Sequence, residues 1–240
     1  MKEIEITLAG VPLRLGLHFP ENADGLRRYI TREDCGGHEI CVGPEEAERY
    51  PLICPSGALT PASEGYLLIA HVSRALLRHE RVLLHGAAFR WRDRAWLFTA
   101  PSGTGKTTQL RNWQRLWPDE LELIGGDKVV LEHRDDGSFW LHPSPWTGKE
   151  GDRGSVSAPL AGIILLRQAD EDRVTRLKPG EAALRIFDQL LITCETEEEA
   201  RAAAGLLDAL LRSVPVWRLE NLGGTASAEL MRRRLEEDVP

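Results

Sequence analysis

Apolar and polar residues alternate along the first part of the chain, and this pattern predicts a small region rich in β-strands. Residues 3–8 and 11–18 each alternate with a period of two, and Gly10 lies at the turn between them, so we expect a hairpin. Residues 19–63 are rich in proline, glycine and acidic residues, which favours loops and short strands. The apolar islands expected to form those short strands are 38–42 and 52–54. We assign residues 1–75 to this small β-rich N-terminal part.

From residue 65 onward, helical periodicity alternates with short apolar runs, a pattern typical of an α/β fold. The expected helices span residues 65–80, 106–117, 181–191, 197–211 and 226–237. The expected strands span residues 82–89, 95–100, 121–124, 128–132, 139–142, 161–166, 174–177 and 214–219. Prolines and glycines interrupt residues 143–157, which are expected to form an irregular loop. We assign residues 76–240 to one α/β domain.

Length and composition exclude several classes of protein. The chain has 240 residues, of which 42% are hydrophobic and 28% are charged, enough for a sizeable core without disulfide or metal cross-links. It has no apolar run near the roughly 18 residues that a membrane span requires. Its first residues do not resemble a secretory signal peptide, so we expect a cytoplasmic protein. The net charge of −7 disfavours nucleic acid as a partner, because nucleic-acid binding requires a basic surface.

The four cysteines, Cys35, Cys41, Cys54 and Cys194, form no pair with metal-binding spacing. A zinc site built from the first three and His38 is an alternative, but gaps of six and thirteen residues do not match the usual zinc motifs. We therefore expect free, buried thiols.

Lysine is scarce in this chain, with five lysines against 25 arginines. Three of the five, Lys106, Lys128 and Lys149, lie in one central stretch. This concentration indicates that lysine has specific roles in that stretch.

Residues 100–107, with the sequence Ala-Pro-Ser-Gly-Thr-Gly-Lys-Thr, match a relaxed Walker A phosphate-loop pattern in which alanine replaces the first glycine. Glycines let backbone N–H groups converge on an anion, and the following helix adds its positive end. Lys106 is expected to reach the β- and γ-phosphates, and the Thr107 hydroxyl is expected to bind Mg²⁺. The alternative, a glycine turn before an ordinary helix, is disfavoured because a strand is predicted before the loop and a helix after it. The residues expected to bind ATP or GTP here are Pro101, Ser102, Gly103, Thr104, Gly105, Lys106, Thr107 and Thr108.

An aspartate and a histidine lie at equal distances from Lys106 along the chain. Asp127 follows Lys106 by 21 residues, at the end of a predicted strand, and His85 precedes it by 21 residues. A carboxylate in that place could hold Mg²⁺ or take a proton from an attacking hydroxyl. The alternatives are an aspartate favoured by its Gly-Gly-Asp turn and a histidine buried against a backbone carbonyl.

At these residues the sequence resembles a known family. His85-Gly86 before a predicted hairpin, the Ser-Gly-Thr-Gly-Lys-Thr loop and the strand that ends in Asp127 are similar to the bacterial HPr kinase/phosphorylase group. The chain resembles more closely the short HPr-kinase-like proteins found beside ribosomal peptide clusters, including lasso peptide kinases. The resemblance covers residues 80–225. It implies a P-loop-containing fold of the HPr kinase/PEP-carboxykinase type, with a mixed sheet flanked by helices.

The resemblance also implies roles for individual residues. Lys106 and Thr107 would match the phosphate-loop lysine and the magnesium-binding hydroxyl. Asp127 would match the second acid of the family's Asp-Asp pair, as base or metal partner, and His85 would match the histidine near the transferred phosphate. The chain departs from the family at Gly126, which replaces the first acid, and it has no Leu-Glu-Ile-Arg-Gly segment. These departures argue against the reverse, dephosphorylating activity of the bifunctional members.

The loop over residues 143–157 is a second candidate for ligand contact. Trp146 is costly to expose, so it packs on the body of the protein or stacks on a ligand. Lys149 and Arg153 could neutralise phosphate charge or hold an acidic substrate. The alternative is a solvated linker with a packed tryptophan, but short kinase-like members of the family have a similar Pro-Trp-x-Gly-Lys segment. The mixed charges of residues 232–238 predict a solvated helix face.

Taken with the resemblance, these observations predict an ATP- and Mg²⁺-dependent kinase, a phosphotransferase with an alcohol group as acceptor. The resemblance implies that the acceptor is a serine of a peptide or protein, such as a ribosomally made lasso peptide precursor. The alternatives are a kinase for a small metabolite, such as free serine, and a non-catalytic module that senses nucleotide. A homo-oligomer is implied only by the type enzymes of the family.

Overall fold

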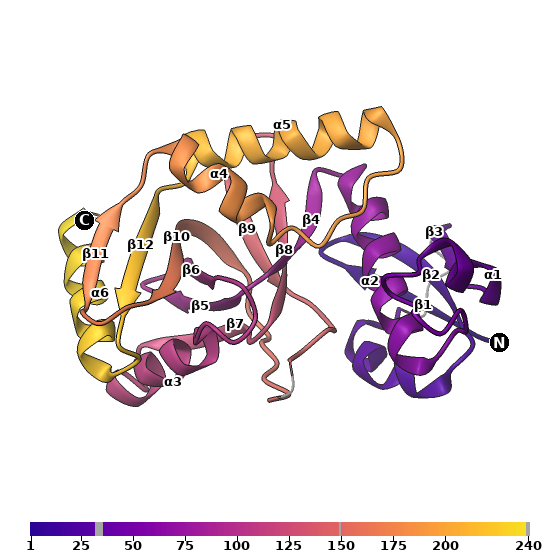
Figure 1. The fold of residues 1–240 in the computed structure, drawn as a ribbon, viewed down its shortest axis with the longest axis horizontal. Coiled ribbons are helices and arrows are strands. Elements are labelled where there is room, and N and C mark those ends of the chain that lie inside the picture. Colours follow the sequence, from indigo (N-terminus) through magenta and orange to yellow (C-terminus); the bar gives the residue numbers. More distant parts are fainter. Residues whose placement is uncertain (32–35, 149, 239–240) are drawn as a thin grey trace.

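The computed structural model describes residues 1–31, 36–148 and 150–238. Its strands are β1 (Lys2–Leu8), β2 (Val11–Leu17), β3 (His38–Cys41), β4 (Arg81–His85), β5 (Ala87–Trp91), β6 (Arg94–Thr99), β7 (Leu121–Gly125), β8 (Lys128–His133), β9 (Phe139–Pro143), β10 (Ala158–Gln168), β11 (Arg173–Arg176) and β12 (Val216–Asn221). Its helices are η1 (Pro20–Tyr29), α1 (Pro44–Arg49), α2 (Pro61–Leu77), α3 (Lys106–Leu116), α4 (Pro179–Phe187), α5 (Glu197–Ser213) and α6 (Thr225–Asp238). Figure 1 shows the two termini at opposite ends of the molecule.

The N-terminal part is a three-stranded sheet covered by helices. β1 and β2 form the expected hairpin, with Ala9 and Gly10 at positive φ in its turn, and β3 pairs with β2 in parallel. Two elements were not expected, the 3₁₀ helix η1 and the short helix α1. The expected strand over 52–54 is wrong, because the N–H groups of Ile53 and Cys54 both bond to the Tyr50 carbonyl and close a turn.

Helix α2 connects the N-terminal sheet to the rest of the chain. It begins at a capping box in which Thr60 and Ser63 each accept a hydrogen bond from the other's backbone N–H. Its buried face shares one hydrophobic cluster with β1 and β2 and with Leu83 of β4 and Val130 of β8. Because side chains alternate along a strand, the neighbours of Leu83 point to the opposite face of the sheet. The N-terminal part therefore packs directly on the edge of the large sheet.

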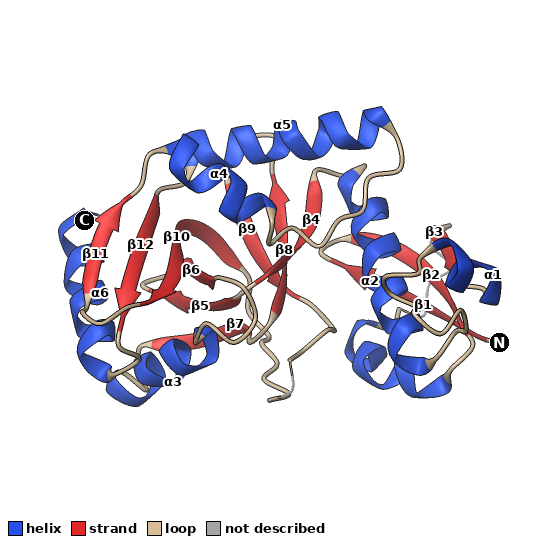
Figure 2. Ribbon diagram, viewed as in Figure 1, coloured by secondary structure: helices blue, strands red, loops and turns tan. Residues whose placement is uncertain are grey.

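The large sheet is mixed, and helices cover both of its faces, as the sequence predicts (Figure 2). Its strand order is β4-β8-β9-β10-β6-β5-β7, and β12 pairs with β10 and with β11. Only β6–β10 and β10–β12 among the pairs of this sheet are parallel in the described residues. Alternate residues of β6 and β10 point to two separate clusters. One cluster contains side chains of α4 and α5, and the other contains side chains of α3 and α6.

The single strand expected over 82–89 is wrong, because the chain changes its pairing partners at Gly86. β4 pairs with β8, whereas β5 pairs with β6 and β7. A Cβ atom at Gly86 would lie 2.8 Å from the Phe98 carbonyl oxygen and 2.5 Å from a methyl group of Leu97. The crossover therefore requires glycine, a constraint that the apolar pattern of 82–89 does not reveal.

Replacing Gly86 by alanine is expected to destabilise the fold. The added methyl group meets the Phe98 backbone carbonyl oxygen as well as the Leu97 side chain, so the free energy of unfolding should fall by about 1–3 kcal/mol. Urea denaturation measures this change. The matched control is Gly205→Ala in α5, where nothing lies within 4 Å of the new Cβ and stability should stay equal or rise by about 0.5–1 kcal/mol. Equal stability of the two variants would contradict the crossover argument.

Candidate functional site

A glycine loop, residues 101–105, joins β6 to α3, so the strand, loop and helix predicted from the sequence are confirmed. Gly103 and Gly105 have φ values of +80° and +108°, which residues with a Cβ atom rarely adopt. A Cβ at either position would have no atom within 4 Å. Backbone conformation rather than crowding therefore requires glycine here, and the loop faces open space.

The side chain of Lys106 lies along the inside of this loop. Its Nζ donates hydrogen bonds to the carbonyl oxygens of Ala100 at 2.9 Å and Pro101 at 3.2 Å. Burial lowers the pKa of Lys106, and the negative charge of Asp127 acts in the opposite direction. The loop thus carries a mostly desolvated ammonium group close to a carboxylate, and its positive charge is offset only in part.

Asp127 lies in the turn between β7 and β8, where its carboxylate is held by two cationic or ionisable partners. Oδ1 is 3.4 Å from Nε2 of His85, and Oδ2 pairs with Nζ of Lys128. The hydrogen bond from His85 and the contact with Lys128 hold the pKa of Asp127 well below its usual range, although burial acts the other way. Asp127 is therefore ionised at neutral pH.

His85 ends β4 and is fixed by backbone and side-chain hydrogen bonds. Its N–H donates to the Gln189 carbonyl at 2.9 Å, and its carbonyl accepts from the Thr99 hydroxyl at 2.6 Å. Its Nδ1 lies 3.0 Å from Oε1 of Gln189, so both ring nitrogens face oxygen atoms. This double contact sets the orientation in which Nε2 reaches Asp127.

These groups meet around one cavity of about 650 Å³, within the range of about 300–1,000 Å³ that is usual for ligand sites. Six parts of the chain line it, and the residues used below are Tyr66, His85, Ser102, Gly103, Thr107, Asp127, Lys128, Asp152 and Leu191. The structure therefore brings together His85, Asp127 and part of the glycine loop, as the equal spacing around Lys106 suggests.

Other predicted site residues lie away from the cavity wall. Five of the residues expected to bind nucleotide do not line the cavity. They are Pro101, Thr104, Gly105, Lys106 and Thr108. Lys106 is buried behind the loop, and Thr108 is exposed on α3. Lys149 lies outside the described residues. Of the two interpretations of Trp146, packing is the one seen, because its side chain contacts the hydrophobic cluster of the N-terminal part.

Two lining residues have roles that the sequence did not reveal. Lys128, noticed only for the scarcity of lysine, pairs with Asp127. Asp152 comes from the irregular loop. A Cβ placed on Gly126 would lie 2.7 Å from the Cβ of Asp152. Asp152 therefore occupies the space that a side chain at position 126 would need. The glycine at position 126 is the only local feature of the sequence that reflects how closely Asp152 lies to it.

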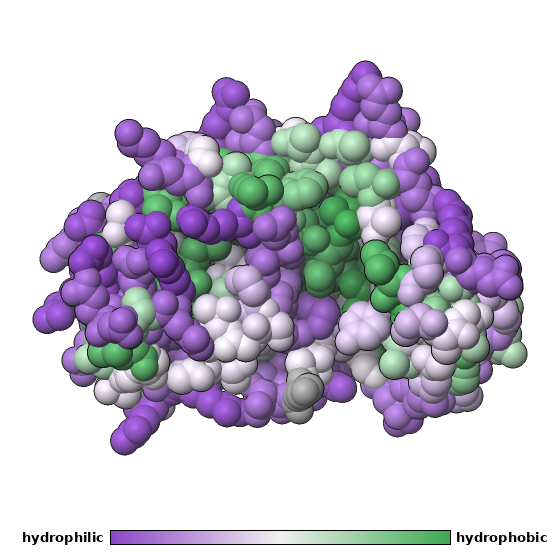
Figure 3. All heavy atoms as spheres, viewed as in Figure 1, coloured by the Kyte–Doolittle hydropathy of each residue, from purple (hydrophilic) through white to green (hydrophobic). Residues whose placement is uncertain are grey.

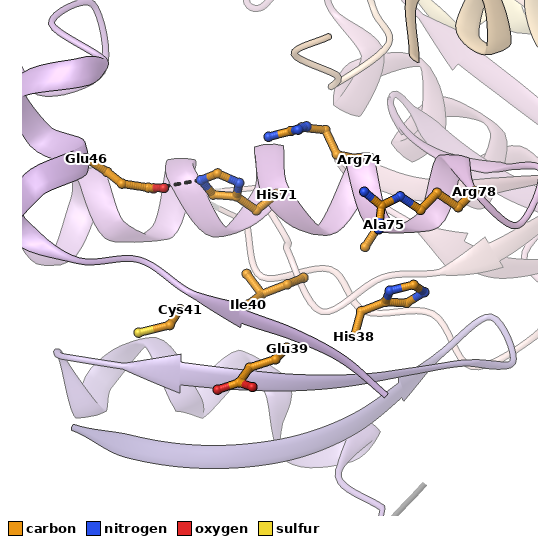
Figure 4. Close-up of a pocket in the computed structure, with 9 residues that line it drawn as sticks. All are labelled: His38, Glu39, Ile40, Cys41, Glu46, His71, Arg74, Ala75 and Arg78. Atoms are coloured by element: carbon orange, nitrogen blue, oxygen red, sulfur yellow. Dashed lines mark hydrogen bonds and ion pairs between the residues drawn. The ribbon is translucent and has the colours of Figure 1, made fainter. Parts of the chain in front are cut away.

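A second hollow lies between β3 and α2, and Figure 4 shows the side chains that line it. Several of its polar groups have partners among nearby residues. His71 contacts Glu46 at 2.7 Å, Arg74 pairs with Glu195 and Glu199, and His38 contacts His79 beside the hollow. These contacts give His38, Glu46, His71 and Arg74 structural roles.

The three cysteines in the described residues, Cys41, Cys54 and Cys194, are free thiols. Cys54 is buried as expected, but Cys41 is exposed and Cys194 is half-buried, which corrects the expectation of buried thiols. Cys35 lies outside the described residues. Among the described residues no group of three or more His, Cys, Asp or Glu side chains could hold a metal ion.

Comparisons with known proteins find a likeness among solved structures. No protein-family model matches the chain, and no curated protein matches it. Among solved structures, the chain is similar to the HPr(Ser) kinase/phosphatase from Coxiella burnetii, with a TM-score of 0.34 and 12% sequence identity. The match covers 64% of this chain and 98% of that chain. A likeness at this level does not bear on function. None of the helices in the described part of the chain is long and apolar enough to span a membrane.

Asp127→Asn is expected to destabilise the protein more at about pH 5 than at about pH 3. The pKa of Asp127 is lower in the folded state than the ordinary unfolded value of about 3.9, so its ionised form stabilises the fold above that pH. This contribution is lost as the pH falls. Between these two pH values the difference in unfolding free energy between wild type and variant should shrink by about 1 kcal/mol. Urea denaturation at both pH values measures it, and a pH-independent difference would show that Asp127 is not held as described.

Proposed function

We propose that this protein is a kinase that transfers the γ-phosphoryl group of ATP to a serine hydroxyl of a peptide or protein. The observation that carries the proposal is that Ser102, Gly103 and Thr107 line the same cavity as the ionised Asp127. Phosphoryl transfer depends on positioning and on charge stabilisation, with a cradle for the phosphates and a carboxylate near the acceptor hydroxyl. In this cavity the glycine loop would serve as the cradle and Asp127 as the carboxylate.

The glycine loop fits a triphosphate. The first N–H groups of α3 have no acceptor within the helix, and a helix N-terminus attracts anions. Gly103 and Gly105 face open space, so phosphate oxygens could approach the backbone closely. Lys106, which bonds to two loop carbonyls, lies where its charge would offset that of the phosphates.

The cavity also fits Mg²⁺ that arrives with the nucleotide. Protein side chains usually supply one or two carboxylates to Mg²⁺, and substrate phosphates and water supply the rest. Thr107, Asp127 and Asp152 line the cavity, and these residues would hold the ion. Bound Mg²⁺ would neutralise charge on the phosphates. Asp152 would thus supply the second carboxylate that Gly126 lacks.

In this proposal Asp127 orients the acceptor hydroxyl and takes its proton. A carboxylate whose pKa lies well below its usual range is a weak base, so the proton would move late, as the new O–P bond forms. That timing suits a loose transition state, in which the nucleophile gains little charge early. His85 and Lys128 keep the carboxylate ionised and fix its direction. They act through Asp127 and are positioning residues.

Asp127→Asn is expected to reduce kcat for phosphate transfer to a serine-containing peptide by about 10²–10⁴, while the affinity for ATP measured without Mg²⁺ changes little. The amide keeps the shape of the side chain but cannot accept the proton. Transfer of labelled phosphate from ATP measures the rate, and equilibrium dialysis measures ATP binding. The control is Asp170→Asn, an exposed aspartate in the turn between β10 and β11, which should behave as wild type. Unchanged kcat in Asp127→Asn would refute the mechanism, and transfer to free serine but to no peptide would refute the acceptor class.

Asp152→Asn is expected to raise the Mg²⁺ concentration needed for half-maximal activity severalfold, because one of two carboxylates at the ion is lost. At saturating Mg²⁺ most of the activity should return. A titration of rate against Mg²⁺ at fixed ATP measures the shift, with Asp170→Asn again as control. A Mg²⁺ dependence identical to wild type would remove Asp152 from the proposed ion site.

A further inference from the structure

An apolar groove lies where α2 faces the segment that follows α4. It has a volume of about 400 Å³, and the residues of its wall used below are Leu52, Tyr66, Ile69, Ala70, Leu191 and Ile192. Figure 3 shows hydrophobic residues gathered on this face of the molecule, in a hollow between the N-terminal part and the α/β body. Exposed apolar surface rimmed by polar residues commonly marks a binding site.

Large side chains at this groove are exposed to solvent. Leu52 is 99% exposed and Tyr66 is 62% exposed. Leu52 lies in the turn that the hydrogen bonds from Ile53 and Cys54 to the Tyr50 carbonyl close, so its backbone is held at the surface. Leu191 is fixed as well, because its N–H donates to the Leu83 carbonyl at 2.8 Å.

The groove adjoins the cavity that contains Asp127. Tyr66 and Leu191 line both of them, so the two hollows share a wall. A chain segment that places a hydroxyl at Asp127 would pass these two residues on leaving the cavity. The groove would then receive the side chains next to that hydroxyl.

We propose that the apolar groove binds the peptide substrate, through large apolar side chains that flank the acceptor serine. The inference rests on the proposed kinase function and names the substrate class more closely. The occupant is a peptide segment rather than a second copy of this chain. Nine residues line the groove, whereas a stable interface between folded proteins uses about 20–30 residues on each side. A groove of this volume suits a few side chains instead.

The test compares two fluorescein-labelled peptides for binding without ATP and for phosphate transfer with ATP. Both have a single serine. One has leucine and phenylalanine beside it, and the other has asparagine at those positions. Wild type should bind the apolar peptide about tenfold more tightly, as expected for burying one or two such side chains. Fluorescence anisotropy measures the affinity.

Two variants place a charge in the groove without touching the catalytic cavity, Leu52→Asp and Ala70→Glu. Each should weaken binding of the apolar peptide about tenfold and leave binding of the polar peptide unchanged. Neither residue is buried, so folding should be preserved, and circular dichroism checks it. The matched control is Leu184→Asp on α4, which replaces a leucine that is 71% exposed outside the groove and should keep the wild-type preference.

The outcomes separate this inference from the proposed function. Equal affinity of wild type for both peptides, or equal loss in Leu184→Asp, would overturn the groove as a peptide site. Self-association of wild type that Leu52→Asp abolishes, seen by sedimentation velocity, would overturn it in favour of an interface between copies. A preserved binding preference without phosphate transfer to either peptide would refute the kinase function and leave the groove as a peptide-binding site.

Discussion

The hydrogen bond from the Gly86 N–H to the Asp127 carbonyl, 2.8 Å long, joins two places where the chain crosses between parts of the large sheet. At Gly86 the chain passes from β4, paired with β8, to β5, paired with β6 and β7. At 126–127 it returns from β7 to β8. Because β4 pairs with β8 and β5 pairs with β7, the two crossovers must lie side by side. The meeting of His85 and Asp127 follows from this topology, although 42 residues separate them in the sequence.

The charges at this meeting point support one another. Burial of a single charge is costly, and burial of a charge with partners is tolerated. Asp127 has Lys128 and His85 within reach, and Lys106 lies near enough to feel its field. The same contacts that stabilise the half-buried carboxylate also lower its pKa and weaken it as a base. A site of this kind is better suited to orienting a hydroxyl than to removing its proton early.

The N-terminal part contributes to the site through α2. One face of the helix packs on β1, β2 and the edge of the large sheet, and Tyr66 on another face lines the catalytic cavity. The apolar groove exists because this second face is left uncovered beside residues 190–193. A part of the chain with no predicted chemistry of its own thus forms one wall of the candidate substrate path.

The sequence by itself determined the types of most elements and the glycine loop, and it singled out His85 and Asp127 as candidate site residues. Hydrophobic periodicity and glycine placement are local properties, so they can be predicted from short segments of the sequence. The tertiary structure alone decided the break of 82–89 at Gly86, the contact of Lys128 with Asp127, the approach of Asp152 to Gly126 and the groove beside Tyr66. Each of these depends on which distant segments the crossovers and helix packing bring together. No pattern within a single segment of the chain encodes those contacts, because they form only when several segments pack at once.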